Sequence, residues 1–274
     1  MKWIKRYIKS PSNRDVQILQ VLLHISIIAS FFYIDPTVLI YGFFIGLLYS
    51  WFGANLTAHR WLTHRYIEVE STLVKVILHY ILTLNIIGSG IVYANVHWQH
   101  HKHTDDVSLD PHTPYRNGIF KTYLRLNGDY RFVFNKRLFK KMLADPVSAF
   151  FHRYYFLVLA ATFVILYLIS IESLFMFFIV PAAVCFHLAQ FQAVLTHTKL
   201  IGATQNYDRD GAEHSYNIWW LKPFLFGEEL HNNHHGNPGS PDSGKPGSWR
   251  EFDPLFNIVI KPFFIYRKKR TDGH

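Results

Sequence analysis

Residues 97–101 read His-Trp-Gln-His-His and residues 231–235 read His-Asn-Asn-His-His, so one His-x-x-His-His pattern occurs twice in the chain. An earlier segment, His59-Arg-Trp-Leu-Thr-His64, forms a third cluster, and His197 stands alone at the end of a long apolar stretch. All of these histidines lie beside apolar segments of membrane length. The pattern therefore predicts a helical membrane protein that binds metal ions near the ends of its helices.

Helix geometry indicates what each cluster can do. Residues three or four positions apart share one face of a helix, so each His-x-x-His-His segment projects three imidazoles from about one turn. The two adjacent histidines of each segment point in different directions, which suits two metal ions better than one. His59 and His64 are five positions apart, a spacing that suits the end of a helix better than its middle.

The nine imidazoles would give four or five ligands to each of two ions. Neutral imidazole suits iron, zinc, copper and nickel. The lone cysteine, Cys185, excludes an intrachain disulfide and a cysteine-rich zinc site. Isolated histidines are interpreted as structural, whereas the roles of His103, His112 and His214 stay open between supporting the metal site and lying at the surface.

The composition is that of a membrane protein. Of 274 residues, 50% are hydrophobic and only 17% are charged, against about 25% in soluble domains. The net charge is +9. Because the basic residues lie in loops beside the apolar blocks, this charge favours anionic lipid as the partner and not nucleic acid.

Four membrane spans are expected in two hairpins. Their approximate ranges are 16–34, 37–56, 154–169 and 174–195. Segment 73–96 is also apolar, but a single crossing there would separate His64 from His97, so we expect it to lie at the interface. The predicted fold is an all-α integral membrane protein with one domain (1–274), whose segments 97–153 and 197–274 form a helical cap on the cytosolic face.

The three clusters occur in a wider motif context. Asp110-Pro111-His112 follows the second cluster, Gly227-Glu228 precedes the third, and residues 249–254 follow downstream. On these motifs, the chain from about residue 54 to 260 resembles the membrane fatty acid desaturase superfamily, close to its stearoyl-CoA desaturase branch. The resemblance implies four transmembrane helices under a cytosolic cap, with the acyl chain in a narrow tunnel.

The resemblance also implies how the histidines divide between two irons. One iron would be bound by His59, His64, His97, His101 and His234. The other would be bound by His100, His197, His231 and His235.

The implied activity is oxygen-dependent formation of a cis double bond in a fatty acyl chain, most similar to Δ9 desaturation. The acyl substrate would be linked to CoA or to a lipid, and O2 would be the co-substrate. A separate ferredoxin, rubredoxin or cytochrome b5 would supply electrons. The expected location is a membrane crossed several times, with the site on the cytosolic side, and a bacterial inner membrane is favoured.

The chain departs from the family pattern at two places. An asparagine of the family, four residues before His197, is Ala193 here, and the neighbouring Gln192 should point elsewhere on a helix. Glu229-Leu230 also replaces a Gly and a Trp that relatives often carry. These changes bear on the surroundings of the second iron and on the approach of the substrate.

Basic residues outside the clusters suggest further contacts. Arg116, Lys121 and Arg125 are candidates for binding the phosphate of a CoA or phospholipid head group. Basic residues at 136–141 and at 267–270 could attract either an acidic electron carrier or anionic lipid.

Two other functions stay open. A hydroxylase of the same superfamily would use the same histidines, and only its product would distinguish it. A membrane metal transporter or storage protein is also conceivable, but transporter ligands normally lie near the middle of the bilayer, whereas these histidines cluster at the ends of the spans.

Overall fold

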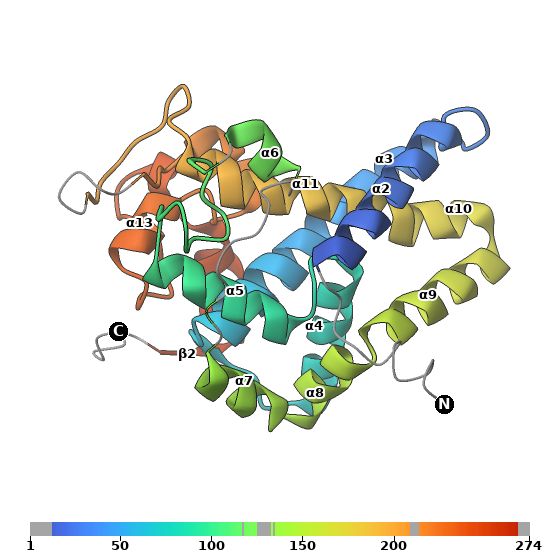
Figure 1. The fold of residues 1–274 in the computed structure, drawn as a ribbon, viewed down its shortest axis with the longest axis horizontal. Helices are drawn as coiled ribbons and strands as arrows, with labels where there is room; N and C mark the ends of the chain where they lie inside the picture. The colour runs from blue at the N-terminus through green and yellow to red at the C-terminus, as the bar shows by residue number, and fades with distance from the viewer. Residues whose placement is uncertain (1–12, 117, 125–132, 134, 209–213, 268–274) are drawn as a thin grey trace. The chain divides into compact units, whose positions relative to one another are not determined.

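The computed structural model describes residues 13–116, 118–124, 133, 135–208 and 214–267 (Figure 1). The first elements are α2 (Asn13–Ser30), α3 (Pro36–Tyr49), η1 (Ser50–Thr63), β1 (Ile67–Glu68), α4 (Thr72–Leu84), α5 (Gly90–Lys102), α6 (Ile119–Tyr123), α7 (Lys136–Leu143), α8 (Pro146–Arg153) and α9 (Tyr155–Ile169). Then follow α10 (Ile171–Leu174), η2 (Phe175–Ile179), α11 (Val180–Val194), η3 (Leu195–His197), η4 (Trp219–Leu221), α12 (Lys222–Leu225), α13 (His231–Gly236), η5 (Trp249–Glu251), η6 (Leu255–Ile260), α14 (Lys261–Phe263) and β2 (Ile265–Tyr266). The regular secondary structure of the described residues is thus almost all helical, as predicted.

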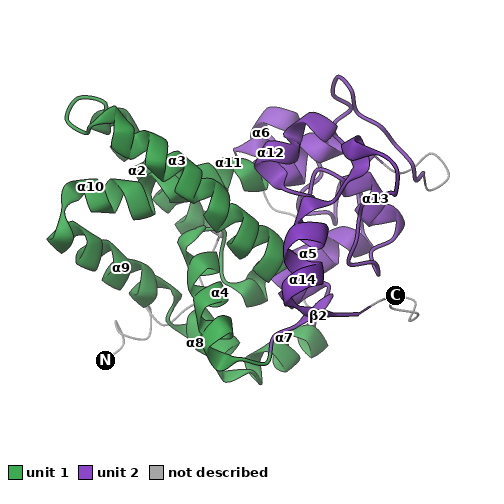
Figure 2. Ribbon diagram, turned by 180° about the vertical axis from the view of Figure 1, so that it is seen from behind, with its two compact units in different colours: residues 1–58, 70–93, 136–189 green, residues 59–69, 94–135, 190–274 purple. Residues whose placement is uncertain are grey.

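The chain divides into two compact units, which Figure 2 distinguishes by colour. Unit 1 comprises residues 1–58, 70–93 and 136–189. Unit 2 comprises residues 59–69, 94–135 and 190–274. All nine clustered histidines belong to unit 2, whereas residues 136–153 of the predicted cap fold as α7 and α8 within unit 1.

The start of α3 follows from its sequence. The side chain of Asp35 accepts a hydrogen bond from the N–H of Thr37 at 2.7 Å, and Pro36 occupies the first turn, where its missing N–H costs nothing. The break expected at Asp35-Pro36 is therefore present. In the structure α2 ends at Ser30, so the connection is longer than the two residues that the apolar pattern indicates.

Within unit 1, two glycines let α3 lie close to the helix that contains α11. A Cβ atom on Gly42 would stand 2.8 Å from Cβ of Val180, and one on Gly46 would stand 2.7 Å from Cβ of Val184. Glycines four residues apart present a smooth helix face, which is how helices approach closely in membranes. Only glycine permits this packing without a shift of one helix.

Two helical stretches of the described residues are long and apolar enough to cross a membrane. They are Pro36–Thr63, with 28 residues, and Ile171–His197, with 27. α8 and α9 pass the same test only as a pair, and they are bent by 71° at their junction. The structure thus supports two spans, or three if the bent pair is one span, and the predicted number of four stays a prediction.

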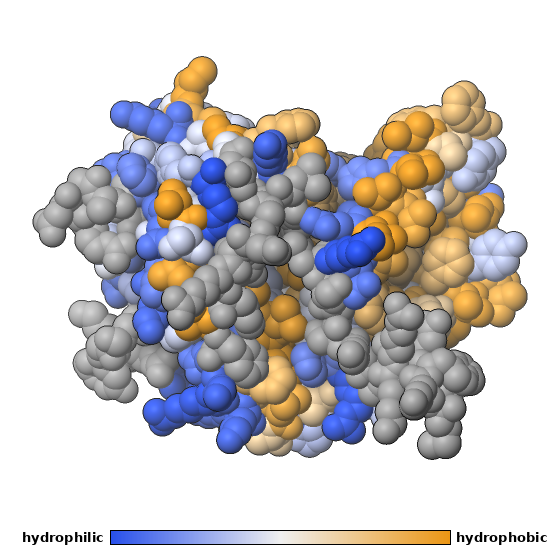
Figure 3. Space-filling view, in the orientation of Figure 1, coloured by the Kyte–Doolittle hydropathy of each residue, from blue (hydrophilic) through white to orange (hydrophobic). Residues whose placement is uncertain are grey.

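Exposed apolar side chains support a lipid environment for unit 1. Figure 3 shows apolar side chains gathered over α3 and α9. Leu168 on α9 is 76% exposed and Phe44 on α3 is 57% exposed. Contiguous exposed surface of this kind is unfavourable in water and favourable against lipid.

The expected interfacial segment 73–96 is split. α4 has 13 residues, fewer than the roughly 20 that a helix needs to cross a bilayer. Ser71 accepts a hydrogen bond from the N–H of Val74 at its start, and the side chain of Asn85 at its end donates to the carbonyl of Tyr49. α5 begins after this break, at Gly90, and carries the second histidine cluster into unit 2.

Unit 2 joins segments that are far apart in the sequence. Ile67 of β1 pairs with Tyr266 of β2 in an antiparallel register. Isolated bridges pair Asn217 with both Thr204 and Leu230. Leu230 directly precedes α13, so these pairings fix the start of the helix that carries the third cluster.

Candidate metal centre

The nine clustered histidines come together as two groups of imidazoles within unit 2. The first group contains His59, His64, His97, His101 and His234, and the second contains His100, His197, His231 and His235. Within each group, ligand nitrogens from all members lie within 4.8 Å of one another. The two groups have the same members as the two sets that the family resemblance implies.

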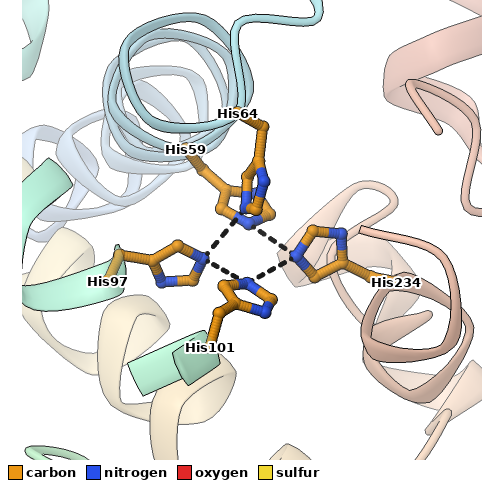
Figure 4. Close-up of side chains that lie close together, drawn as sticks. All are labelled: His59, His64, His97, His101 and His234. Carbon is orange, nitrogen blue, oxygen red and sulfur yellow. Dashed lines mark hydrogen bonds between the residues drawn. The ribbon is translucent and has the colours of Figure 1, made fainter. Parts of the chain in front are cut away.

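The first group draws on three separate segments, and its imidazoles point toward one another (Figure 4). The Nε2 atom of His234 lies 3.2 Å from that of His59 and 2.9 Å from that of His101. The Nε2 atom of His97 lies 2.9 Å from that of His101 and 3.2 Å from that of His64. Five imidazoles thus direct their Nε2 atoms at one small volume.

A widened helix turn explains how His59 and His64 converge. The N–H of His64 donates to the carbonyl of His59 at 3.0 Å, a hydrogen bond across five residues. η1 is π-helical, a conformation that is rare and often found at functional sites. The ring centroids of His59 and His64 are consequently only 4.7 Å apart.

The imidazoles of the second group also direct their Nε2 atoms toward one another. The Nε2 atom of His100 lies 3.3 Å from that of His235, and the Nε2 atom of His197 lies 3.0 Å from that of His231. The adjacent residues His100 and His101 of α5 serve different groups, as do His234 and His235 of α13. The adjacent histidines therefore point to two different sites, as the spacing predicts.

Three carboxylates lie behind the imidazoles, each beside an Nδ1 atom. Oε2 of Glu228 is 2.7 Å from Nδ1 of His59. Oδ1 of Asp110 is 2.9 Å from Nδ1 of His100, and Oδ1 of Asp105 is 3.2 Å from Nδ1 of His197. A carboxylate at Nδ1 fixes the ring tautomer and leaves Nε2 free to bind a metal ion.

A buried arginine supports the carboxylate behind His59. The side chain of Arg60 is 1% exposed, and its Nε atom donates to Oε1 of Glu228 at 2.7 Å. Its Nη1 atom donates to Oδ2 of Asp253 at 2.8 Å and to the carbonyl of Pro241 at 2.9 Å. This pairing compensates the buried charges, and breaking such a pair is strongly destabilising.

Position 227, which lies beside this ion pair, requires glycine. Its φ is 113°, and a Cβ atom there would collide with Oδ1 of Asp253. The Gly227-Glu228 motif therefore combines a backbone conformation that favours glycine with the carboxylate that holds His59.

The charges of the buried groups suit a metal site. Burial and the neighbouring imidazoles lower the pKa of His97, His231, His234 and His235 well below the usual value, so these rings are neutral. Burial alone would raise the pKa of Glu228, but Arg60 and His59 lower it to about 2. Burial also opposes ionisation of Asp110, yet the imidazole of His100 brings its pKa well below the usual range. Neutral imidazoles backed by ionised carboxylates are the protonation states that metal binding requires.

The spacing of the imidazole nitrogens fits metal ions. Ligand nitrogens about 2.1 Å from an ion and at right angles to one another are about 3 Å apart. The Nε2 separations of 2.9–3.3 Å match that value. The donor atoms described at this site are imidazole nitrogens, with carboxylates behind some of the rings. The lone cysteine, Cys185, is buried in unit 1 and belongs to neither histidine group.

Two of the three predicted head-group residues, Arg116 and Lys121, lie within the described residues. Arg116 is engaged by the chain itself, because its Nε atom donates to the carbonyl of Val107 and its Nη2 atom to that of Asp110. Lys121 is exposed on α6, and Arg125 lies outside the described residues. Arg116 thus fixes the loop that carries Asp110.

The departures from the family pattern have structural consequences. The side chain of Gln192 donates to Oε2 of Glu228 at 3.2 Å, so it reaches toward the first histidine group and does not replace the missing asparagine beside the second. Glu229 is fully buried, and its Oε2 atom accepts from the N–H of Gly227 at 2.7 Å. Burial raises the pKa of Glu229 to about 7, with Lys222 3.7 Å away as its nearest cation among the described ion pairs.

Sequence reasoning missed several supporting residues. Asp105 was not identified, although it lies in a short acidic run after the second cluster. Arg60 and Asp253 were also not identified, because an ion pair between distant segments leaves no periodic signal. Two of the histidines whose roles the sequence leaves open contact residues of the second site. The ring of His112 lies 5.5 Å from that of His100, and the N–H of His214 donates to Asp105.

Comparison with known proteins agrees with this geometry. The family model for fatty acid desaturases matches residues 20–246. The chain is 30% identical over 212 residues to Delta-9 acyl-lipid desaturase 2 of Arabidopsis thaliana, covering 76% of this chain and 66% of that protein. It is 27% identical over 215 residues to sn-2 palmitoyl-lipid 9-desaturase of Nostoc sp. (strain 36), covering 77% and 73%.

A third relative shows that similar sequences act on another acyl carrier. Acyl-CoA C20 Delta5-desaturase of Anemone leveillei is 26% identical over 212 residues, covering 76% of this chain and 65% of that protein. The family match therefore agrees with the convergence of the histidines. The chain belongs to the fatty acid desaturase family of oxidoreductases.

Proposed function

We propose that the chain is an oxygen-dependent acyl desaturase that uses two irons to introduce a cis double bond into a fatty acyl chain. The observation that carries the proposal is the convergence of nine imidazoles as a group of five and a group of four. The named relatives act at position 9 in two cases and at position 5 in one. We therefore expect a Δ9-like product from a lipid-linked or CoA-linked substrate.

Each iron would be bound by one group of histidines. The first iron would be bound by His59, His64, His97, His101 and His234. The second would be bound by His100, His197, His231 and His235. Bound iron with O2 would supply the oxidant for removing hydrogen from an unactivated methylene, which no amino-acid side chain can supply. In the balanced reaction, a –CH2–CH2– unit, O2, two electrons and two protons give a cis –CH=CH– unit and two molecules of water.

The chain's own residues have two tasks in this proposal. Glu228, Asp110 and Asp105 orient the imidazoles of His59, His100 and His197, because a carboxylate oxygen lies within 3.2 Å of each Nδ1 atom. The burial of the histidines keeps bulk water from the site, since His59 is 0% exposed and His231 is 2% exposed.

The topology belongs to the same proposal. We place residues 1–274 in one membrane desaturase domain with four spans, and the histidine site on the cytosolic side of a bacterial inner membrane. Two of the four proposed spans, 37–56 and 174–195, coincide with helical stretches that are long and apolar enough to cross a membrane. Lys121, which is exposed, is the best placed of the three head-group candidates to meet a phosphate.

The fatty acid profile of a desaturase-deficient host that expresses the chain tests this function. A new monoenoic acid, with its double bond located by mass spectrometry, is the expected result, and the His100→Ala variant should abolish it. A hydroxylated acyl chain would instead assign a hydroxylase. Iron-loaded protein that forms no product with a working electron donor would favour a metal-handling protein.

A further inference from the structure

Unit 2 exposes a group of large apolar side chains that belong to neither histidine group. Ile201 is 94% exposed, Trp249 65%, Phe252 42% and Trp220 39%. We call these four residues the aromatic patch. Exposed apolar patches of this kind usually mark interaction surfaces.

The aromatic patch is held together by specific contacts. Nε1 of Trp220 donates to the carbonyl of Ile201 at 2.9 Å. Nζ of Lys222 donates to the carbonyls of Trp249 at 2.8 Å and Phe252 at 2.6 Å. Three segments of the chain are thereby fixed to one another, so the patch is a preformed surface.

Cationic side chains contact the aromatic patch or lie near it in the sequence. The guanidinium of Arg250 lies over the rings of Trp219 and Trp249, with its Cζ atom 5.1 Å and 5.8 Å from the ring centroids. Lys199 and Lys245 are exposed nearby in the sequence. Glu251 is only partly exposed and accepts a hydrogen bond from Asn206. An apolar surface with a cationic border fits a partner that has an acidic border.

One backbone hydrogen bond links the chain segment that carries Trp220 of the aromatic patch to the segment of the third histidine cluster. Trp219, whose ring lies 5.3 Å from that of Trp249, follows Ile218 in the chain. The N–H of Ile218 donates to the carbonyl of Glu229 at 3.0 Å, two residues before His231. A short route of covalent bonds and one hydrogen bond therefore connects the patch to a histidine of the second group.

Resting on the proposed function, we propose that the aromatic patch is the docking surface for the electron carrier. The partner is a small soluble one-electron carrier with acidic side chains around its redox group. Two carriers, each oxidised by one electron in successive encounters, provide the two electrons that accompany O2 and two protons in the balanced reaction. A small patch suits such a partner, because electron-transfer complexes bury little surface, typically under about 1,200 Å².

The exposed cations of α7 directly precede α8 and α9, so in this proposal we assign them to lipid head groups and not to the carrier. Tryptophan is also common at membrane interfaces, so contact of the aromatic patch with lipid is the alternative that the experiment must separate.

The test uses the full-length protein in nanodiscs of zwitterionic lipid, with and without iron. The probes are an acidic [2Fe–2S] ferredoxin and an acidic cytochrome b5, and their binding is measured by calorimetry at low and high salt. We compare the wild type with the Trp249→Ser/Arg250→Glu variant and with Phe120→Ser, a control that truncates another aromatic residue of unit 2, 75% exposed on α6.

We expect at least one carrier to bind the wild type and the control, and the double variant to bind it about tenfold more weakly or worse, because truncating a central Trp or Arg typically costs that much. The iron-loaded variant, reduced chemically with dithionite, should still form wild-type amounts of alkene. Equal carrier binding by the variant, or no binding of either carrier to the wild type, would overturn the docking proposal.

Two further results keep the alternatives apart. If brominated lipid in the nanodisc quenches tryptophan fluorescence more in the wild type than in the variant that lacks Trp249, and the variant binds the carrier as the wild type does, the aromatic patch would be assigned to lipid and the proposal overturned. Failure of the wild type itself to form alkene with dithionite would refute the proposed function, whereas the carrier affinities would still report on docking.

Discussion

Nδ1 of His59 lies 2.7 Å from Oε2 of Glu228, and the other oxygen of the same carboxylate accepts a hydrogen bond from Arg60, the next residue in the chain. One buried carboxylate therefore orients an imidazole and neutralises a buried guanidinium. Its negative charge, and not only its shape, is required for both tasks.

The first prediction concerns Glu228. Glu228→Gln keeps the size of the side chain but removes the charge, so we expect metal affinity to fall about 10-fold to 100-fold, with some loss of stability. Titration of the metal-free protein with iron measures the affinity. The control is Glu68→Gln, which removes an exposed ion pair with Arg267. Equal metal affinity in the wild type and Glu228→Gln would contradict the role of the carboxylate.

The second prediction concerns the other group of histidines. Asp110 accepts from Nδ1 of His100 and from the N–H of His112, and Asn in its place would bring an NH2 group against one of these donors. We expect Asp110→Asn to lower the iron content from about two per chain toward one. Asp106→Asn is the matched control, because Asp106 is exposed in the same loop and only caps a turn. Two irons per chain in both variants would show that Asp110 does not support the second site.

The third prediction concerns the packing of unit 1. A Cβ atom on Gly46 would stand 2.7 Å from Cβ of Val184 and 3.1 Å from Cα of Pro181. Gly46→Ala should therefore destabilise the protein by about 1–3 kcal/mol, as overpacking does, and lower its melting temperature in detergent. Leu48→Ala on the same helix truncates a side chain that is 47% exposed and should change the melting temperature less. The reverse order would exclude close packing at Gly46.

The fourth prediction concerns pH. Burial alone would raise the pKa of Asp145, but hydrogen bonds from Ser148 at the start of α8 and from Lys75 lower it. The stabilisation from the ionised form is therefore complete above the unfolded pKa, about 3.9, and is lost as the pH falls through the lower folded value.

Melting temperatures of the wild type and two variants test this dependence. Asp145→Ala should lose about 1 kcal/mol at neutral pH through the missing cap. Asp145→Asn can still cap the helix and should lose only the smaller contribution of the charge. Both differences from the wild type should shrink as the medium becomes acidic, and a difference that grows toward low pH would contradict the assigned pKa direction.

Much of the site could be predicted from sequence because short helical spacing is local. Two residues four positions apart, such as His97 and His101, must share a helix face wherever the helix lies. The position of His59 and His64 could only be approximated, since a hydrogen bond across five residues widens the turn that carries them. Local spacing thus indicates the ligands, but it does not predict a π-helical turn.

The remaining features depend on contacts between distant segments. The pairing of Arg60 with Asp253 joins residues that are 193 positions apart, so no pattern in the sequence reveals it. The predicted hairpin spans rest on apolar length alone, whereas α9 has 15 residues and reaches span length only together with α8, across a bend of 71°. Hydropathy indicates which segments are apolar, but it does not predict where a helix bends.

A single-turnover experiment tests the central claim most directly. The purified protein is loaded with iron, reduced with dithionite without air, and mixed with O2 and an acyl substrate deuterated at two neighbouring carbons. We predict two irons per chain and up to one alkene per chain, with loss of deuterium from both carbons and no oxygen in the product. An alcohol that contains an atom from O2, or a protein with two irons that leaves the substrate unchanged, would contradict the assignment as a di-iron desaturase.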